Sequence, residues 1–535
     1  MTRHVLRRAL LTVVAIVGMV SLAAGGAAAQ ITSASLSGIV HDAQGGVVPG
    51  ATITLVSKSQ GTGIEAVSGG QGEFAFPVVP ADTYTLKVTM EGFKTVEVPS
   101  LVVHPGDKLN IGTLAIEVGS LTESVTVEGK APVLQTASAE RSYSVEGEAI
   151  QSIAVNGRSF FGLAYNAPGV VQTGPPGALG PQSNTMSANG LRPNQNNVQI
   201  DGITSMDTGS NQGPAVSLSI DAVQEIKVLT SNYQAEYGRS AGAQITAVTK
   251  SGSSKYAGSG YFVRRNDDLN SNTWFNNQTN PVTPTPPMQQ KDLGFTLGGP
   301  IVIPGVSEKG APKLFFFGGQ EYQRRLLPQT TPQRVRVPTD LERQGNFSQT
   351  LDSAGNLYPY IRDYTTGLPC SASNTAGCFK YNGVVGWIPP DRLYAMGLNV
   401  LKMYPVANSA GTIAQGYNYV TQAPTEAPRR QDIIRVDFQP NPQWRITGKL
   451  LQTGGPNLAP YGGGTIGFST NIPDFGYNDP SRNNRGVSFT VSKVLSNTMF
   501  LEVTYGRSRN EFNSLPASST FNKTSLGLSA FPMLY

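Results

Sequence analysis

The chain has 535 residues, enough for several domains, and its formal charge of +5 falls to +2 once the three arginines of an N-terminal leader are set aside. That balance gives no basis for a nucleic-acid partner. With 60 glycines, 37 prolines, 20 tyrosines, 21 phenylalanines and only 14% charged residues, the composition favours strands, turns and long polar loops over helices.

Residues 1–29 are typical of a secretory signal peptide. Three arginines within the first eight residues form a basic start, an apolar run follows over residues 9–20, and Ala-Ala-Ala before Gln30 offers a cleavage site. The apolar run is too short for a membrane helix, which needs about 20 apolar residues. We therefore expect an exported protein that could span a membrane only as a β-barrel.

Residues 30–118 are expected to form a small β-sandwich. Alternating apolar and polar runs are separated by turn-forming glycine and proline pairs. The segments GIVHDAQGGVVPGATITLV and GEFAFPVVPADTYTLKVTMEGFK resemble the carboxypeptidase regulatory-like domain, a transthyretin-like sandwich with a carbohydrate-binding-like fold. One departure is Pro80-Ala81-Asp82, where the family usually has Pro-Gly before the tyrosine. The expected strands cover residues 35–40, 51–56, 73–76, 84–89 and 109–116.

Residues 119–252 resemble the α/β plug domain of TonB-dependent receptors. Near their start, LTESVTVEGKAPVL resembles a TonB box, the segment that TonB would bind. A short extended β-branched segment can add as a strand to the edge of a partner's sheet. The same motif, taken alone, also fits an ordinary strand between two domains. The candidate TonB-box residues are Glu123, Ser124, Val125, Thr126 and Val127.

Three further motifs follow in the order of the plug family. Gly-Leu-Arg at 190–192 matches its I-R-G-like step, Ile-Asp-Gly-Ile at 200–203 its L-D-G-V step, and Tyr-Gly-Arg-Ser-Ala-Gly at 237–242 its ending. The resemblance implies that Arg192 and Arg239 tie the plug to a barrel wall. The plug residues expected from these motifs are Gly190, Arg192, Asp201, Gly202, Tyr237, Gly238, Arg239 and Gly242.

Residues 253–535 show the period-2 pattern of antiparallel strands. In residues 434–439, for example, Ile, Val and Phe alternate with Arg, Asp and Gln. One apolar and one polar face per strand suits a barrel between lipid and a wet lumen, although the strands of a soluble sandwich alternate too. The expected strands cover residues 256–265, 291–300, 313–324, 430–439, 443–452, 484–494 and 499–508.

The connections between these seven expected strands alternate in length. Residues 266–290, 325–429 and 453–483 form long connections, and the three between them are short. Bacterial barrels have short periplasmic turns and longer extracellular loops, so we expect the long loops outside and the N-terminal domain in the periplasm. Receptors of this family have about 22 strands, so the chain is expected to be an N-terminal fragment that contains the first seven.

The longest loop contains both cysteines. Cys370 and Cys378 lie eight positions apart, and in an exported protein such a pair is expected to form a disulfide. The run from TTGLPC to WIPPDRLYAMGLNVLKMYP resembles the outer loop of Oar-like barrels, with a short helix after Ile388-Pro389-Pro390. The leucines and methionine of residues 393–401 roughly fit one helical face.

The histidines give no indication of an active site. His4 lies in the leader, while His41 and His104 lie in the sandwich without a neighbouring H-x-x-E motif. The chain has no G-x-S-x-G sequence and no P-loop ending. We therefore expect no enzyme, no metal and no cofactor.

The fold class is thus expected to be mainly β, with a sandwich, an α/β plug and part of a transmembrane barrel. The expected function is that of an outer-membrane receptor for active uptake of a large ligand, energised by TonB and its inner-membrane complex. The expected partners are TonB, outer-membrane lipid and an unidentified ligand, with a glycan, a peptide and protein export all left open. The alternatives are a cell-surface adhesion protein that binds carbohydrate through the sandwich, and a secreted regulatory domain attached to an enzyme.

Overall fold

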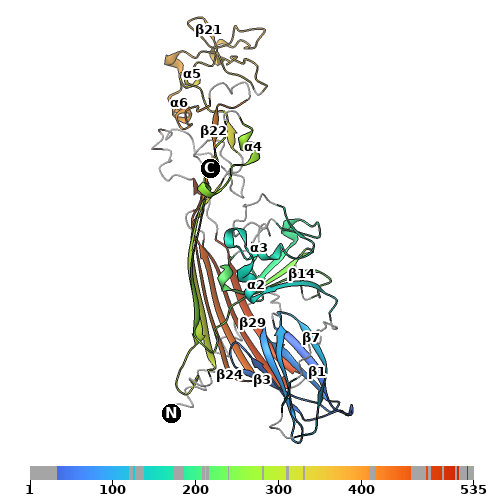
Figure 1. The fold of residues 1–535 in the computed structure, drawn as a ribbon. Helices are drawn as coiled ribbons and strands as arrows, with labels where there is room; N and C mark the ends of the chain where they lie inside the picture. Colours follow the sequence, from blue (N-terminus) through green and yellow to red (C-terminus); the bar gives the residue numbers. More distant parts are fainter. Residues whose placement is uncertain are drawn as a thin grey trace.

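In the computed structural model the chain forms three parts built mainly of β-strands (Figure 1). Long strands make a curved wall, a plug domain packs on one face of it, and a small sandwich lies at one end. The expected signal peptide lies outside the described residues. The structure describes residues 33–119, 124–126, 138–173, 186–207, 211, 216–235, 237–238, 240–279, 282–308, 312–328, 332–352, 354–409, 416–459, 477–479, 483–496, 499–511, 515–516, 524 and 527.

The N-terminal domain is a two-sheet β-sandwich, as expected. Its strands are β1 (Ala34–Asp42), β2 (Thr52–Ser57), β3 (Gly63–Val67), β4 (Glu73–Val79), β5 (Asp82–Thr89), β6 (Thr95–Val103), β7 (Lys108–Ile116) and β8 (Ser124–Thr126). One sheet has the order β4-β1-β7 and the other β3-β2-β5-β6-β8. Their inward faces meet in a core that includes Leu36, Ile53 and Phe76. The sequence expectation lacked β3 and β6. In β6 the alternation is broken at Pro99, where its pairing with β5 shifts register.

The departure from the family pattern at residues 80–82 does not disturb the turn before β5. Tyr84 is only 2% exposed, and its hydroxyl donates to the carbonyl oxygen of Pro80 at 2.9 Å. Burial raises the pKa of this phenol well above its ordinary value. The hydrogen bond therefore closes the turn from inside the core.

Replacing Tyr84 with phenylalanine should lower the free energy of unfolding of the sandwich by about 1 kcal/mol, because the Pro80 carbonyl loses a buried donor. Urea unfolding of the full-length protein in detergent, followed by protease digestion of the sandwich, measures the change. Tyr364→Phe is the control, since Tyr364 is 83% exposed. Equal unfolding midpoints for the two variants would contradict the assigned role of the hydrogen bond.

The plug is a mixed α/β domain whose five-stranded sheet carries two short helices. Its elements are β9 (Arg141–Glu146), α2 (Gly147–Ser152), η1 (Asn156–Arg158), α3 (Phe161–Ala164), β10 (Val170–Gln172), β11 (Met186–Ala188), η2 (Pro193–Gln195), β12 (Asn197–Ile200), β13 (Ile203–Thr204), η3 (Ile220–Ala222), β14 (Val223–Ser231) and β15 (Gln244–Thr249). The sheet order is β13-β12-β15-β14-β9. Phe160, Leu163 and Ile226 belong to its core, which also includes Phe317 and Ile433 of the wall.

The Ile-Asp-Gly-Ile motif forms a two-residue β-hairpin. Ile200 pairs with Ile203 across the turn, while Asp201 and Gly202 have φ of 53° and 82°. A hairpin of this type needs positive φ at both central residues, which Asp-Gly tolerates well. The motif therefore has a structural cause, and it fixes Asp201 at the tip of the turn.

The wall consists of seven long strands, and each is antiparallel to the next along the chain. They are β16 (Ala257–Asn266), β17 (Gln289–Pro300), β18 (Leu314–Leu327), β24 (Arg429–Asn441), β25 (Trp444–Gly454), β28 (Asn483–Ser496) and β29 (Met499–Arg509). Among the described residues β16 and β29 do not pair with each other, so the sheet is an open part of a barrel. All seven strands agree with those expected from the alternation.

In the wall, polar side chains are buried on one face and apolar side chains are exposed on the other, which is the reverse of a sheet in a soluble protein. Polar side chains such as Glu321, Asp437 and Ser488 are buried. The other face exposes Phe262, Leu293, Phe295, Leu297, Ile434, Leu450, Val487, Phe489, Leu501, Val503 and Tyr505. Soluble proteins rarely expose so large an apolar surface, whereas a membrane barrel has an apolar outside and a polar lumen. The alternative of a soluble sandwich in this part of the chain is therefore wrong.

The described parts of the long connections project from the end of the wall away from the sandwich, and those of the short connections lie at the sandwich end (Figure 1). The elements of the connections and the remaining short strands are η4 (Asp267–Leu269), α4 (Trp274–Asn277), β19 (Gln333–Val335), α5 (Asp340–Arg343), η5 (Tyr364–Thr366), β20 (Lys380–Tyr381), β21 (Val384–Val385), η6 (Pro390–Arg392), α6 (Ala395–Lys402), β22 (Tyr419–Thr421), β23 (Thr425–Glu426), β26 (Asn457–Ala459), β27 (Tyr477–Asp479) and β30 (Leu515–Pro516). The helix expected after residue 390 is α6, although none of its residues is fully buried. Among the described helices, none is long and apolar enough to cross a lipid bilayer.

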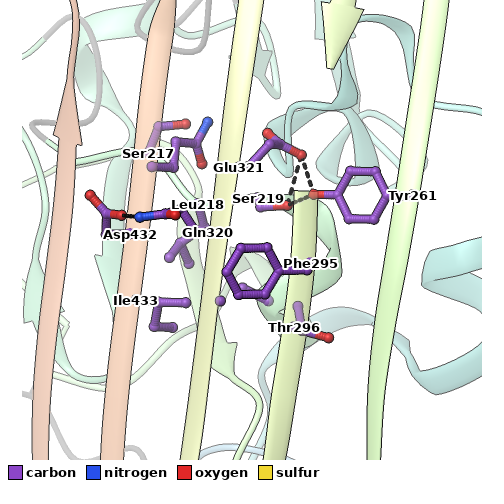
Figure 2. A pocket seen from close by; sticks show the side chains of 13 residues that line it. Ser217, Leu218, Ser219, Tyr261, Phe295, Thr296, Gln320, Glu321, Asp432 and Ile433 are labelled. Carbon is purple, nitrogen blue, oxygen red and sulfur yellow. Dashed lines mark hydrogen bonds between the residues drawn. The ribbon is translucent and has the colours of Figure 1, made fainter. Parts of the chain in front are cut away.

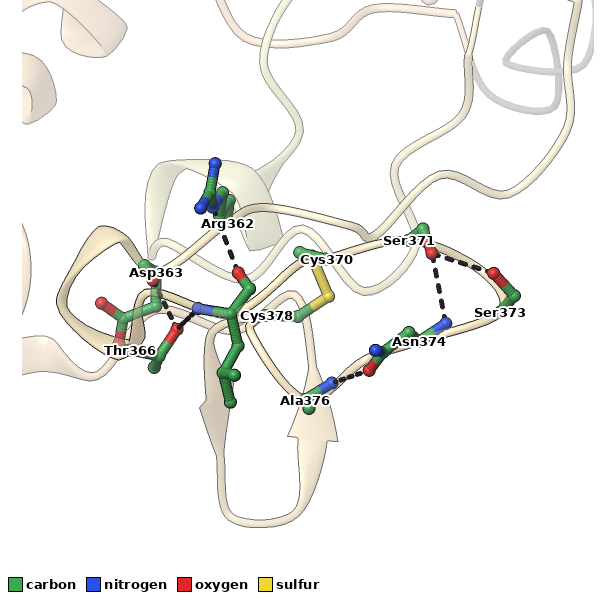
Figure 3. The surroundings of a disulfide bond; sticks show 10 residues. Arg362, Asp363, Thr366, Cys370, Ser371, Ser373, Asn374, Ala376 and Cys378 are labelled. Atoms are coloured by element: carbon green, nitrogen blue, oxygen red, sulfur yellow. Dashed lines mark hydrogen bonds between the residues drawn. A yellow bond between two sulfur atoms is a disulfide. The ribbon is translucent and has the colours of Figure 1, made fainter.

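A disulfide fastens one of the outer loops (Figure 3). Cys370 and Cys378 are bonded to each other, with their Cα atoms 4.8 Å apart. Beside them, Asp363 accepts two hydrogen bonds from the guanidinium of Arg392, which hold the pKa of this carboxyl well below its usual range. A covalent bond and polar contacts thus fasten this part of the loop.

Candidate functional site

The segment that resembles a TonB box lies as an edge strand on the sandwich. β8 runs parallel to β6, so that residues 124–126 lie opposite residues 95–97. Glu123 and Val127, the outer residues of the motif, lie outside the described residues. The described part of the segment is therefore extended and bound through its backbone.

The first plug motif forms a turn at the surface. Gly190 follows Asn189, and both have positive φ, at 78° and 52°. Arg192 is exposed just after this turn, and Arg239 lies outside the described residues. The role expected for these two arginines at the barrel wall stays a prediction.

The last plug motif packs tightly against the rest of the plug. A Cβ atom at Gly242 would lie 2.8 Å from the backbone carbonyl oxygen of Gln195, so only glycine fits there without a backbone shift. The carbonyl of Gly242 accepts a hydrogen bond from the hydroxyl of Tyr233 at 3.0 Å, and the ring of Tyr237 packs edge to face on Tyr233. Gly238 has open space around it, so its lack of a side chain has no steric cause.

Asp201 connects the plug to the wall through a buried ion pair. Its carboxylate lies 3.1 Å from the ammonium of Lys449 on β25, and it accepts hydrogen bonds from the backbone and hydroxyl of Thr249 at 3.0 and 2.8 Å. Burial alone would raise its pKa, but the charges of Lys449 and Arg435 hold the pKa of Asp201 below its usual value. Arg435 also donates to the carbonyl of Thr249 at 2.6 Å.

A second group of polar contacts joins the plug to β16 and β18 (Figure 2). The hydroxyl of Ser219 lies 3.0 Å from Glu321 and 2.9 Å from the hydroxyl of Tyr261, and Tyr261 also donates to Glu321. Arg158 of the plug pairs with Asp221 and lies 3.6 Å from Glu321. Ser219, Tyr261 and Glu321 line a small pocket between the plug and the wall.

A buried ion-pair cluster joins the sandwich to the plug. The ammonium of Lys227 on β14 lies 2.8 Å from Asp107 of the sandwich and 3.0 Å from Glu140, and it donates to the carbonyl of Pro105 at 3.1 Å. All three charged side chains are at most 3% exposed. Burial would lower the pKa of Lys227, but the two carboxylates raise it above its ordinary value.

A second charged cluster lies beside the first. Nδ1 of His104 is 2.7 Å from Glu225 of β14 and 3.8 Å from Glu146 of β9. The hydrogen bond to Glu225 raises the pKa of the imidazole above its ordinary value. The loop between β6 and β7 thus docks two of its residues, His104 and Asp107, on one face of the plug sheet.

The sandwich also contacts the wall, and an open polar chamber lies between the three parts. Gln60 donates to the carbonyl of Gly252 at 3.2 Å, directly before the wall begins. Gln439 of β24 donates to the carbonyl of Gly63 at 3.3 Å. Lys449 borders the chamber, so this side of the plug lies in polar surroundings.

Sequence reasoning found Asp201 but missed most of the residues that hold the parts together. Glu225 and Lys227 lie two positions apart in the strand VQEIKVLTS, most of which is buried. Two charges on one face of a buried strand would have indicated a polar contact with another part. Arg158 and His104 gave no such indication, because their partners are distant in sequence.

We expect Asp201→Asn to weaken the contact between plug and wall by about 3 kcal/mol, because the ammonium of Lys449 would remain buried without its partner. The urea concentration at which protease gains access to the plug measures this effect. The control is Glu97→Gln. Its partner Lys87 is 44% exposed, so this ion pair contributes only about 0–1 kcal/mol to stability. An unchanged midpoint for Asp201→Asn would show that the plug is held by other contacts.

Three family models match successive parts of the chain. Residues 35–117 match the carboxypeptidase regulatory-like domain, residues 135–243 the TonB-dependent receptor plug domain, and residues 248–533 the outer membrane beta barrel domain. The last match alone covers more than half of the chain. Their order is that of the sandwich, the plug and the wall.

The chain is also similar to individual proteins. The TonB-dependent transporter Oar of Myxococcus xanthus is 31% identical over 310 residues, which are 55% of this chain and 27% of the transporter. The chain thus spans about a quarter of that relative. The outer membrane transporter YddB from Escherichia coli aligns with a TM-score of 0.40 and 11% identity, over 68% of this chain and 38% of its own. The siderophore receptor PirA from Acinetobacter baumannii aligns with a TM-score of 0.35 and 12% identity, over 69% of this chain and 40% of the receptor. The outer membrane beta barrel model matches more than half of this chain, and the match to the plug model directly precedes it along the sequence. The chain therefore belongs to the TonB-dependent receptor family of the outer membrane.

Proposed function

We propose that this chain takes part in active uptake of a large ligand through a plugged barrel, energised by TonB and its inner-membrane complex. The observation that carries the proposal is the position of the plug, which packs on the polar face of the wall. Its contacts there include ion pairs and hydrogen bonds such as Asp201–Lys449, beside an apolar contact with Phe317 and Ile433. Polar contacts can exchange for water as the plug moves, so a pull on the plug would open a polar path.

We assign the sandwich to the periplasm and the long loops to the cell exterior. The short connections lie at the sandwich end of the wall, and outer-membrane barrels have their short turns on the periplasmic side. The disulfide between Cys370 and Cys378 lies in the longest connection, which suits an oxidising location. In this orientation the sandwich and β8 face the compartment that TonB reaches.

The TonB contact is assigned to the segment Glu123–Val127. Its described part, β8, is already extended and pairs over three residues at a sheet edge. TonB can bind such a segment by offering a different strand edge, because the ladder uses only backbone groups. The ligand class proposed is a glycan or a peptide, and no catalytic step is involved.

Site-specific cross-linking in cells tests this assignment. A photo-reactive residue in place of Thr126 should capture TonB, whereas the same residue in place of Tyr364, an exposed residue of an outer loop, should not. Capture of TonB from position 364 would invert the assigned orientation. Failure to capture it from position 126, with the receptor present in the outer membrane, would remove the TonB-box assignment.

The alternative function, sugar binding by residues 30–118 in an adhesion protein, also stays a prediction. Calorimetry of the full-length protein in detergent with soluble oligosaccharides tests it. Saturable binding that is lost when residues 33–118 are deleted would favour the adhesion function.

A further inference from the structure

Two carboxylates face each other on the plug sheet where the sandwich docks. Glu146 of β9 and Glu225 of β14 are direct partners in the antiparallel pairing of these strands, so their side chains lie on the same face. Like charges directly opposite each other destabilise a pair of strands. The side chain of Glu225 is only 3% exposed and that of Glu146 is 49% exposed, so solvent screens this repulsion only in part.

An imidazole from the sandwich lies over this pair. The ligand atoms of His104, Glu146 and Glu225 all lie within 4.8 Å of one another, which makes this the one group of three such donors among the described residues. The nearby ammonium of Lys227 does not neutralise the pair, because it is bound to Asp107 and Glu140. With both glutamates ionised, even a protonated His104 would leave a net charge of −1 on these three side chains.

The three donors are held in place by their surroundings. The backbone N–H of His104 donates to Asp107 at 3.1 Å, and Asp107 is itself fixed by Lys227. Both glutamates lie on the paired strands β9 and β14. Sites on rigid elements lose little freedom when they bind a ligand, and the partial exposure of Glu146 gives an ion access from solvent.

We propose that His104, Glu146 and Glu225 form a site for a divalent transition-metal ion, with zinc as the best match. Zinc binds imidazole nitrogen and carboxylate oxygen, usually with four ligands, so water would complete the site. Calcium and magnesium are less suited, because they prefer oxygen ligands alone. Zinc–ligand bonds of about 2.0–2.2 Å require the His104–Glu225 separation to open from 2.7 Å to about 3.4 Å.

The ligands come from two domains, so a bound ion would join them. His104 belongs to the sandwich, whereas Glu146 and Glu225 belong to the plug. A divalent ion bound by two carboxylates and a neutral imidazole would carry no net charge. It would therefore remove the repulsion between the glutamates and strengthen the docking of the sandwich beside the buried Lys227 cluster. This inference rests on the geometry alone and does not depend on the proposed uptake function.

Metal titration of the full-length protein in detergent tests the proposal. After removal of metals with a chelator, zinc is titrated in competition with a chromophoric chelator. We expect one equivalent of zinc to bind, His104→Ala to abolish this binding and Glu146→Gln to weaken it at least about tenfold. Glu146→Gln keeps the shape of a half-exposed side chain, so the fold should persist. His41→Ala, which removes the other histidine of the sandwich, should bind zinc like the parent.

A second measurement shows whether bound zinc joins the sandwich to the plug or binds without effect on their contact. Zinc should protect the junction between sandwich and plug from protease, and the chelator should remove this protection in the parent but change nothing in His104→Ala. The proposal is overturned if zinc fails to bind stoichiometrically, if His104→Ala binds it as tightly as the parent, or if bound zinc leaves protease sensitivity unchanged. The first of these results would mean that His104 and Glu225 form only a hydrogen-bonded ion pair.

Discussion

Replacing Val125 with proline is expected to abolish TonB binding and to reduce uptake to the level of cells that lack TonB. Proline has no backbone N–H, and its ring fixes φ near −65°. A strand added to a sheet edge is held by just these backbone groups. Val125 is the middle residue of β8 and lies opposite Val96, so the substitution falls where the ladder of hydrogen bonds is formed.

The docking of β8 on the sandwich sharpens this expectation. TonB must first replace β6 as the partner of β8, and that exchange is inexpensive because only three residues pair. Each backbone hydrogen bond is worth about 0.5–1.5 kcal/mol net. Proline at position 125 would weaken the docking on β6 as well, so the segment would be freer than in the parent. If TonB binding is lost, the cause could then not be a stronger pairing of β8 with β6.

The measurement is capture of the full-length receptor in detergent by the periplasmic domain of TonB, together with uptake in cells. Val125→Thr is the matched control, since threonine keeps both the N–H and the β-branched shape and should behave like the parent. An antibody against the loop that contains Cys370 and Cys378 shows that each variant reaches the cell surface. If Val125→Pro binds TonB like the parent, the segment is an ordinary strand between two domains.

The fold of the wall could be predicted from the sequence because its strands are governed by a local rule. Every second residue must face lipid, as Ile434, Val436 and Phe438 illustrate, so the period is visible without knowledge of the partner strands. Asp201 and Gly202 were singled out through their match to a plug-family motif, and the structure shows that this motif is a two-residue hairpin with strict local requirements. The positions of α6 and of the cysteine pair also depend on short stretches of sequence.

The contacts between the parts could not be predicted in this way. His104 and Glu225 are 121 positions apart, and the sequence around His104 has no metal-binding pattern of its own. The pairing of β8 with β6 depends on which edge of the sandwich remains free, and β6 itself was obscured by Pro99. Such contacts arise only after each domain has folded, so no local periodicity marks them.

Replacing Lys227 with methionine is expected to detach the sandwich from the plug at a cost of about 3–5 kcal/mol, because two buried carboxylates would lose the cation that they share. Asp107 and Glu140 are 1% and 3% exposed beside this ammonium, so water cannot take its place while the domains stay docked. Protease sensitivity of the junction at increasing urea concentrations measures the loss. Lys87→Met is the control, since its ion pair with Glu97 is exposed and is worth only about 0–1 kcal/mol.

A compensated variant separates the charge effect from a packing effect. Methionine has nearly the length and volume of the lysine stem, so Lys227→Met combined with Asp107→Asn and Glu140→Gln removes all three charges while it preserves most of the shape. Neutral replacement of a whole buried ion-pair group is often harmless to stability, so this triple variant should recover most of the docking that the single variant loses. If the triple variant is as labile as Lys227→Met, the lysine acts through its packing or its hydrogen bond to Pro105, and the electrostatic account of the interface is wrong.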